Sequence, residues 1–387
     1  MENFDFHVRT QILFGKNQIE ALPKSLAPFG KKVLLVYGGG SIKKNGVYDN
    51  VIRLLSENNF IVTELSGVEP NPRIETVRKG VELCRENNIE VILAVGGGSV
   101  IDCSKAIGGA YYYDGDAWDI VLDRTKITKV LPIVTVLTLA ATGSEMNKNS
   151  VISKMDTNDK KGTSSLEFIP MVSICDPTYM YTLPAIQTAA GTADIMSHTF
   201  ENYFKSENDT YVQDRFAEGI LKTCIHYCPI AIEKPDDYSA RANLMWASTL
   251  ALNGLLGVGK GSQSWSCHPI EHELSAYYDI THGTGLAILT PRWMRYILSE
   301  KTLSKFVDYG VNVFSLNPSE DPYVIANKAI DLTEEFFVKI GIPMHLSELG
   351  IGSEKFDEIS KKLDGVFKDA YIPLKSDDVK KILEMCL

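Results

Sequence analysis

Four side chains in the second half of the sequence are of the types that bind a divalent metal ion. Asp194 and His198 lie four positions apart, so on a helix they project from the same face, one turn apart. The dipeptide Gly-Thr at 191–192 suits the N-terminus of that helix. His268 and His282 follow in two later segments, as expected where separate elements converge on one ion. One carboxylate with three imidazoles suits Fe(II), Zn(II) or a similar borderline metal.

A second metal motif overlaps this set. His268, Glu271 and His272 spell H-x-x-E-H, the pattern of inverted zinc proteases, in which both histidines bind zinc and the glutamate activates water. Pro269 is tolerated only in the first turn of a helix, so it places His268 at a helix start. A metallopeptidase leaves the upstream Asp/His pair and the glycine loops of the first half without a role. We keep it as the alternative from another enzyme class.

A glycine-rich turn in the first half is a candidate for binding a dinucleotide. The run AVGGGSVID at 94–102 follows an expected strand and opens an expected helix. Gly97 and Gly98 allow the backbone to approach a pyrophosphate, and the N–H groups at the helix start, with Ser99, favour its charge. Asp102 would orient the nicotinamide end of the cofactor, or else simply place an acid near the helix N-terminus. A tight turn without a ligand is the plain alternative for the run.

A second turn, YGGGSIKK at 37–44, follows another expected strand. In a dinucleotide site an acid at this position holds the adenosine ribose diol of NAD and repels a 2′-phosphate. No residue of the turn is acidic, and two lysines follow it, so the turn predicts NADP(H); a loop with solvated lysines is the alternative. The candidate cofactor contacts here are Gly38, Gly39, Gly40, Ser41 and Lys43.

A third turn, at 140–145, follows the strand expected at 131–137. Thr138 and Thr142 would present hydroxyls at the carboxyl end of a parallel sheet, where open α/β folds bind ligands. Alone, a Thr-Gly-Ser turn is more often structural than functional.

The elements that must position these residues change character along the chain. Continuous apolar strands separated by helices predict a mostly parallel sheet covered on both faces, whereas amphipathic helices dominate after residue 190. We therefore predict a Rossmann-like dinucleotide-binding domain at 1–184 and an all-helical metal-binding domain at 185–387. The expected strands are 32–37, 60–65, 91–95, 131–137 and 172–175; expected helices include 48–58, 74–87, 209–227, 238–253 and 326–340.

Bulk properties exclude several classes of partner. A net charge of −10 over 387 residues argues against binding to nucleic acid or an anionic membrane, whose phosphates would be repelled. The longest apolar stretch, at 130–141, is too short to cross a bilayer, and no signal peptide is visible. Seven scattered cysteines favour a reducing compartment. We expect a cytoplasmic protein with neither nucleic-acid nor membrane partners.

Together these motifs resemble the iron-containing, or group III, alcohol dehydrogenases, and most closely their NADP-dependent butanol dehydrogenases. The resemblance implies a Rossmann-like α/β domain followed by a helical domain, the architecture shared with dehydroquinate synthase, and commonly a homodimer. It also implies that the metal ligands are Asp194, His198, His268 and His282, with His272 a histidine near the cofactor. The segments that carry the resemblance are 37–51, 95–105, 138–147, 191–204 and 268–289.

The predicted activity is the interconversion of primary alcohols and aldehydes, such as butanol and butyraldehyde, with NADP(H). A metal ion, Fe(II) or Zn(II), would act as a Lewis acid on the substrate oxygen. His272 is the candidate for relaying the alcohol proton to solvent. A related polyol dehydrogenase and a non-catalytic protein that binds metal and nucleotide are the remaining alternatives.

Overall fold

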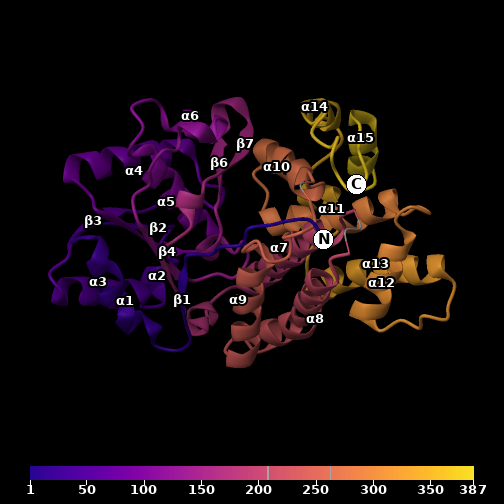
Figure 1. The fold of residues 1–387 in the computed structure, drawn as a ribbon, viewed down its shortest axis with the longest axis horizontal. Helices are drawn as coiled ribbons and strands as arrows, with labels where there is room; N and C mark the ends of the chain where they lie inside the picture. The colour runs from indigo at the N-terminus through magenta and orange to yellow at the C-terminus, as the bar shows by residue number, and fades with distance from the viewer. Residues whose placement is uncertain (207–208, 262) are drawn as a thin grey trace. The chain divides into compact units, whose positions relative to one another are not determined.

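A six-stranded parallel sheet organises the first half of the chain (Figure 1). The computed structural model describes residues 1–206, 209–261 and 263–387. Because all neighbouring strands run parallel, the carboxyl ends of the six strands lie along one edge of the sheet. In spatial order the strands are β1 (Gln11–Phe14), β8 (Val172–Cys175), β5 (Ile133–Leu137), β4 (Val91–Gly96), β2 (Lys32–Tyr37) and β3 (Ile61–Leu65).

Helices cover both faces of this sheet (Figure 1). They are α4 (Ile74–Asn87), α5 (Gly98–Ala110) and α6 (Ala117–Leu122) on one face, and α1 (Leu22–Leu26) and α3 (Val47–Glu57) on the other. Alternate residues of a strand enter opposite cores: Leu34 and Val36 pack with α4 and α5, whereas Val33 and Leu35 pack with α1 and α3. Burial on both faces is the reason that these strands read as continuous apolar runs.

The predicted strands agree with the structure to within two residues at each end, but two features of the sheet region were not predicted. The first is the short edge strand β1. The second is an antiparallel hairpin of β6 (Asn149–Lys154) and β7 (Asp159–Ser164). The hairpin has few apolar residues, and polar side chains such as Ser150 and Thr163 occupy its buried positions. It therefore lacks the apolar alternation from which strands are recognised.

The chain forms two compact units, and neither is one uninterrupted segment. The sheet unit comprises His7–Leu183 and Pro235–Asn253; the helical unit comprises Met1–Phe6, Pro184–Lys234 and Gly254–Leu387. Helix α9 (Tyr238–Leu252) is thereby part of the sheet unit. Within that unit, the hydroxyl of Thr249 donates to the buried Glu145 Oε1 at 2.6 Å. The predicted division at residue 184 therefore differs for two segments: Met1–Phe6 belongs to the helical unit, and Pro235–Asn253 belongs to the sheet unit.

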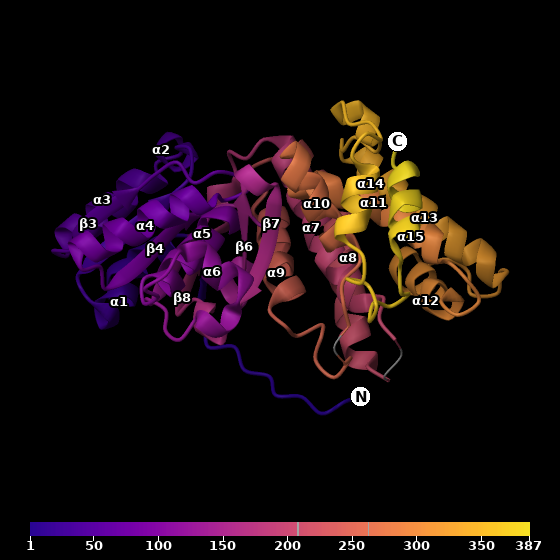
Figure 2. The same cartoon turned by 90° about the horizontal axis from the view of Figure 1, so that it is seen from above.

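One helix of the helical unit (Ala185–Tyr203), labelled α7 in Figure 2, is buried throughout most of its length. Every residue of α7 from Thr188 to its end is buried. No strand occurs in the described part of this unit, and no described helix of the chain is long and apolar enough to cross a membrane. The other long helices are α8 (Tyr211–Glu233), α10 (Cys267–Tyr278), α11 (His282–Ile297), α12 (Leu303–Phe314) and α13 (Pro322–Lys339); α14 (Phe356–Lys362) and α15 (Ser376–Glu384) are shorter.

Candidate metal centre and dinucleotide loops

Asp194 and His198 lie one turn apart on α7, and both side chains are buried. The expectation that the pair lies near a helix N-terminus was wrong, because α7 begins at Ala185 and runs through Gly191 without a break. Burial of the whole helix outweighs the modest cost of a glycine in its interior. The two polar side chains therefore project from the middle of a helix into the protein interior, where polar groups need partners.

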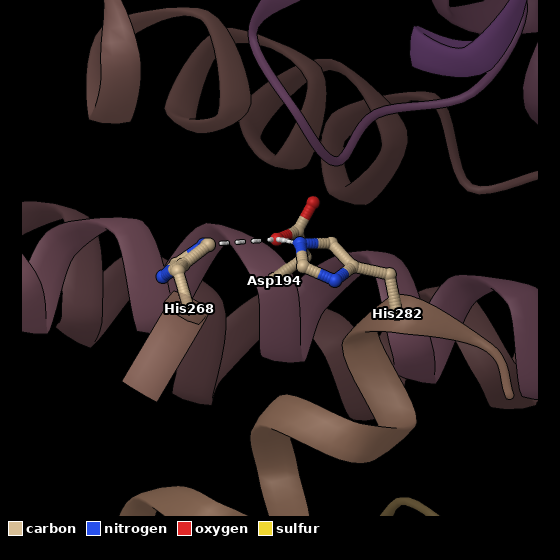
Figure 3. A group of neighbouring side chains, drawn as sticks. All are labelled: Asp194, His268 and His282. Atoms are coloured by element: carbon tan, nitrogen blue, oxygen red, sulfur yellow. Dashed lines mark ion pairs between the residues drawn. The ribbon is translucent and has the colours of Figure 1, made fainter. Parts of the chain in front are cut away.

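Two further helices bring imidazoles to Asp194 (Figure 3). His268 is the second residue of α10, with Pro269 in its first turn as predicted, and His282 opens α11. Their Nε2 atoms lie 3.9 Å and 3.6 Å from Asp194 Oδ1. Donor atoms bound tetrahedrally at about 2.1 Å from one ion are about 3.4 Å apart. The three residues are therefore spaced to share a single cation.

His198 lies against this group but is not one of its three members. Its ring stacks on the ring of His268, with centroids 4.6 Å apart, and its Nδ1 is 3.4 Å from Asp194 Oδ1. Burial, reinforced by the neighbouring imidazoles, holds the pKa of His198 well below its usual range. The ring is therefore neutral at physiological pH, which is the form in which histidine binds metals.

Buried nitrogen atoms without hydrogen bonds are a second observation, independent of the spacing, that favours a divalent cation at this site. His198 Nδ1 and His268 Nε2 are buried, yet neither forms a hydrogen bond with the described residues. A buried polar atom without a hydrogen bond costs about 1–3 kcal/mol. A cation near Asp194 would satisfy both the buried carboxylate and the lone pairs of the imidazoles.

A glycine allows α11 to approach α7 closely enough to deliver His282. A Cβ atom on Gly283 would lie 1.9 Å from the carbonyl oxygen of Ala190. Since the clash would be with backbone, no rotation of a side chain could relieve it. Gly283 is therefore required by helix packing directly beside a candidate ligand.

Two glutamates contact the histidines of the site, and of these the sequence associated only Glu271 with a metal, as the water-activating residue of the peptidase alternative. Glu201 Oε1 lies 3.2 Å from His268 Nδ1, and Glu271 Oε2 contacts His282 Nδ1. Glu201 follows Asp194 by seven residues on α7, so the i, i+4, i+7 spacing of three polar residues was the signal available in the sequence.

The contacts of Glu271 do not support the metallopeptidase alternative. Its carboxylate binds the Nδ1 of His282 and the hydroxyl of Ser275, so it is occupied within the protein. His268 and His272 lie nearly perpendicular, with ring centroids 6.3 Å apart. His272 is closer to His282, at 5.5 Å between centroids. His268 of the H-x-x-E-H pattern thus belongs to a site that also includes Asp194 on α7 and His282 on α11.

The predicted cofactor loops follow three adjacent strands of the sheet unit. Residues 38–41 follow β2, residues 97–99 follow β4, and Thr138 follows β5, with its N–H donating to Gly96 at 3.0 Å. The chain continues from β2 to its neighbour β3 on one side, but from β4 to its neighbour β5 on the other. This reversal is a topological switch point, where doubly wound sheets bind nucleotides.

Some of the residues predicted to contact the cofactor in the loop after β4 contact other parts of the protein. A Cβ atom on Gly98 would lie 2.2 Å from the hydroxyl of Thr142, so this glycine is also needed for packing between two loops. The hydroxyl of Ser99 donates to the carbonyl of Pro70. Gly97, at the N-cap of α5, presents its backbone at the start of that helix. The helix N-terminus itself remains the feature suited to a phosphate.

Asp102 is held by protein groups on both carboxylate oxygens. Oδ1 accepts from the hydroxyl of Ser144, and Oδ2 accepts from the N–H of Val151 at 2.9 Å. The neighbouring Lys105 donates to the same Ser144 at 2.7 Å, and burial lowers the pKa of this lysine to about 8. The network ties α5 to the Thr-Gly-Ser turn and to the hairpin. This geometry favours a positioning role for Asp102 over direct contact with a nicotinamide.

The turn after β2 has an acidic neighbour that is distant in sequence. Gly40 has a φ of 106°, and the short helix α2 (Ser41–Lys44) follows it. Glu64, near the end of β3, accepts hydrogen bonds from the hydroxyls of Tyr37 and Tyr48 at 2.7 Å and 3.0 Å. The Lys43 ammonium lies over both tyrosine rings, 4.5 Å from the centroid of Tyr48. An acid is therefore present beside the turn, although it is engaged by tyrosines.

Comparisons with known proteins cover nearly the whole chain. Residues 9–177 match the family model described as iron-containing alcohol dehydrogenase. Residues 188–387 match the model for the C-terminal part of the Fe-containing alcohol dehydrogenase family. The crystal structure of NADH-dependent butanol dehydrogenase A from Thermotoga maritima is similar, with a TM-score of 0.94 at 41% identity over 100% of this chain and 99% of that one.

The names of the sequence relatives include both NADH-dependent and NADPH-dependent enzymes. The chain is 56% identical to NADH-dependent butanol dehydrogenase A of Clostridium acetobutylicum, over 99% of both chains. It is 42% identical to the NADPH-dependent aldehyde reductase YqhD of Escherichia coli, over 94% of this chain and 93% of that one. The comparisons therefore support alcohol and aldehyde chemistry and give no support to peptidase activity.

Gly283→Ala tests the close approach of α11 to α7. The added methyl group should displace His282, lower the free energy of unfolding by about 1–3 kcal/mol and reduce bound metal well below one ion per chain. Gly219→Ala is the control, because Gly219 is exposed on α8 and a Cβ there meets nothing within 4 Å. Metal content by elemental analysis and stability by chemical denaturation check the result. Full metal content with unchanged stability would contradict this packing argument.

Proposed function

Because the chain belongs to the iron-containing alcohol dehydrogenase family, we propose that it interconverts a primary alcohol and its aldehyde, using one divalent metal ion and NADP(H). The observation that carries the proposal is the convergence of Asp194, His268 and His282 from three helices. The family matches over both halves of the chain supply the reaction class.

The metal centre would be held by Asp194, His198, His268 and His282. When bound, the cation, Fe(II) or Zn(II), supplies a Lewis acid to the oxygen of the alcohol or aldehyde. Asp194 contributes the negative charge of the donor set, and the three imidazoles contribute neutral nitrogen lone pairs. His198 would need only a small side-chain movement to join the group, since its Nδ1 is already 3.4 Å from Asp194 Oδ1.

An aromatic wall beside the donor set supports a short apolar substrate. The indole of Trp265 lies 4.7 Å from the His268 ring and 5.8 Å from the His198 ring, measured between centroids. A half-buried indole offers apolar contact to an alkyl chain and no charge that would recognise an acid or an amine. The names of the butanol dehydrogenases among the relatives agree with a substrate of this kind.

His272 is our candidate for moving the alcohol proton. It lies on α10 one turn after His268, and its ring is 5.5 Å from that of His282. It is half-buried, so it can exchange a proton with solvent. In this role His272 accepts the hydroxyl proton during alcohol oxidation and returns it during aldehyde reduction.

The glycine turns support a dinucleotide, and the turn after β2 supports NADP(H) over NAD(H). The turn carries no acid of its own, and Lys43 places a positive charge next to it. Glu64, the nearby acid, already accepts two hydrogen bonds from tyrosines. A carboxylate so engaged is less able to accept from a ribose diol, which is the contact that selects NAD.

The proposed function is tested by aldehyde reduction under anaerobic conditions. Butyraldehyde, a polyol-derived aldehyde and a peptide substrate are assayed with NADPH and with NADH, and metal content is measured on the same sample. We expect NADPH oxidation with butyraldehyde that is lost on chelation and regained with Fe(II) or Zn(II). Absence of turnover in metal-loaded protein with any aldehyde would overturn the proposal.

Alanine variants of His268 and His272 should distinguish the role of a metal ligand from that of a proton relay. His268→Ala should lose both metal and turnover while NADPH binding remains measurable, because the cofactor loops belong to the sheet unit. His272→Ala should retain stoichiometric metal and reduce turnover by about 10²–10⁴-fold, the usual contribution of general acid–base catalysis. Elemental analysis, fluorescence titration with NADPH and steady-state kinetics check both variants. Loss of metal from His272→Ala would make this residue a ligand.

Gly39→Asp should shift cofactor preference towards NADH. The side chain fits, because a Cβ at Gly39 meets nothing within 4 Å, and its charge should repel a 2′-phosphate. We expect the Michaelis constant for NADPH to rise by at least about tenfold relative to that for NADH, a difference of about 1.4 kcal/mol. Gly39→Asn, of equal size but uncharged, is the control. An unchanged ratio of the two constants would remove the argument for NADP.

A further inference from the structure

We propose that Glu201 and Glu271 are positioning residues that hold His268 and His282 with Nδ1 protonated, so that each Nε2 lone pair is directed at the metal position beside Asp194. The inference rests on the proposed metal centre and deepens it. It concerns how the protein prepares its ligands before any ion arrives.

Glu201 forms hydrogen bonds with the backbone at the start of α10 and also contacts the ring of His268. Its Oε1 accepts from the N–H groups of Cys267 and His268 at 2.8 Å and 3.0 Å, and its Oε2 accepts from the N–H of Ser266 at 2.9 Å. The same Oε1 lies 3.2 Å from His268 Nδ1. Four donors thus surround one buried carboxyl group, and the helix N-terminus favours negative charge there.

The identity of the partner atoms determines the tautomer of His268. An ionised carboxylate can only accept hydrogen bonds, so Nδ1 must carry the proton in that contact. A neutral imidazole has one proton, so Nε2 keeps its lone pair. That atom is the buried one that forms no hydrogen bond with any described residue and lies 3.9 Å from Asp194 Oδ1.

Glu271 performs the same operation on His282 from a different helix. Its Oε2 contacts His282 Nδ1, and its Oε1 accepts from the hydroxyl of Ser275. The side chain of Glu271 is completely buried. His282 Nε2 is thereby turned towards Asp194 Oδ1, at 3.6 Å. The two carboxylate–histidine pairs converge on one point, although Glu201 lies on α7 and Glu271 on α10.

This arrangement has two physical consequences for metal binding. Each ring is held in one orientation and one tautomer, so less conformational entropy is lost when an ion binds. A carboxylate behind the ring also raises the basicity of the ligating nitrogen. Loss of such a partner typically weakens metal binding by about 10–100-fold. The two glutamates therefore act on the cation only through the histidines.

The variants Glu201→Gln and Glu271→Gln test this role by metal affinity in protein freed of metal, without reference to turnover. We expect the dissociation constant for Co(II), measured by calorimetry, to rise by about 10–100-fold in each, with a changed visible absorption spectrum of the bound ion. Glu218→Gln is the matched control, because Glu218 is a buried carboxylate on α8 that accepts from Tyr203, Arg215 and Asn312 and contacts no histidine among the described residues.

A second measurement determines the tautomers in the unmodified chain and uses alanine variants only to assign the signals. The sequence contains seven histidines, so long-range ¹H–¹⁵N NMR spectra of histidine-labelled, metal-free protein are simple. The signals of His268 and His282 are assigned by their loss from His268→Ala and His282→Ala. At pH 8 both rings should show the Nδ1–H tautomer.

The outcomes distinguish this inference from the proposed function. Weakened Co(II) binding in the two glutamate variants, with the control unchanged, supports it. Wild-type affinity in both variants, equal weakening in all three, or an Nε2–H tautomer in either ring overturns it while leaving the metal centre intact. If the unmodified protein binds no Co(II), the proposed function fails first, and this inference fails with it.

Discussion

Burial of the Asp194 carboxylate in the middle of α7 is the constraint on which the helical unit depends. An ionised carboxylate removed from water is costly unless charge or hydrogen bonds compensate it. Imidazole nitrogens of His198, His268 and His282 lie 3.4–3.9 Å from its Oδ1. Neutral imidazoles do not balance a negative charge, whereas a cation held between them and the carboxylate does. Helix α11 packs closely against α7 at Gly283, and Glu201 of α7 accepts hydrogen bonds from the N-terminus of α10, so these contacts gather the three helices around Asp194.

A different constraint shapes the sheet unit. Parallel strands place all their carboxyl ends on one edge, and the winding reverses between β2 and β4, the position at which folds of this kind bind nucleotides. Glycines in those loops serve two purposes, because Gly98 also makes room for Thr142. Hydrogen bonds among Asp102, Ser144 and Lys105 connect the helix after β4 to the turn after β5. A rigid frame of this kind suits the binding of a dinucleotide through backbone N–H groups.

Several acids near the candidate sites contact other protein groups, and two of them, Glu201 and Glu271, are buried. Glu201 and Glu271 contact histidines, Glu64 binds two tyrosines, and Asp102 binds a serine and a backbone N–H. For the two histidines the carboxylate, which can only accept, determines which ring nitrogen carries the proton. The hydrogen bonds of these acids orient the groups around them.

By itself the sequence determined the parallel sheet, the helical character of the second half, the glycine turns and the identities of the four metal-binding candidates. Those features follow from local periodicity and residue chemistry, which each segment carries within itself. Tertiary structure alone decided that α9 packs with the sheet, that Glu64 lies beside the turn after β2, and that Glu201 and Glu271 hold the histidines. Those partners lie 11 to 104 residues apart in sequence, as with Thr249 and Glu145. No local pattern pairs such residues: the i, i+4, i+7 spacing on α7 marks Glu201 as polar on the same face, but does not identify its partner on α10. Such contacts arise only when buried polar groups must find one another in the folded chain.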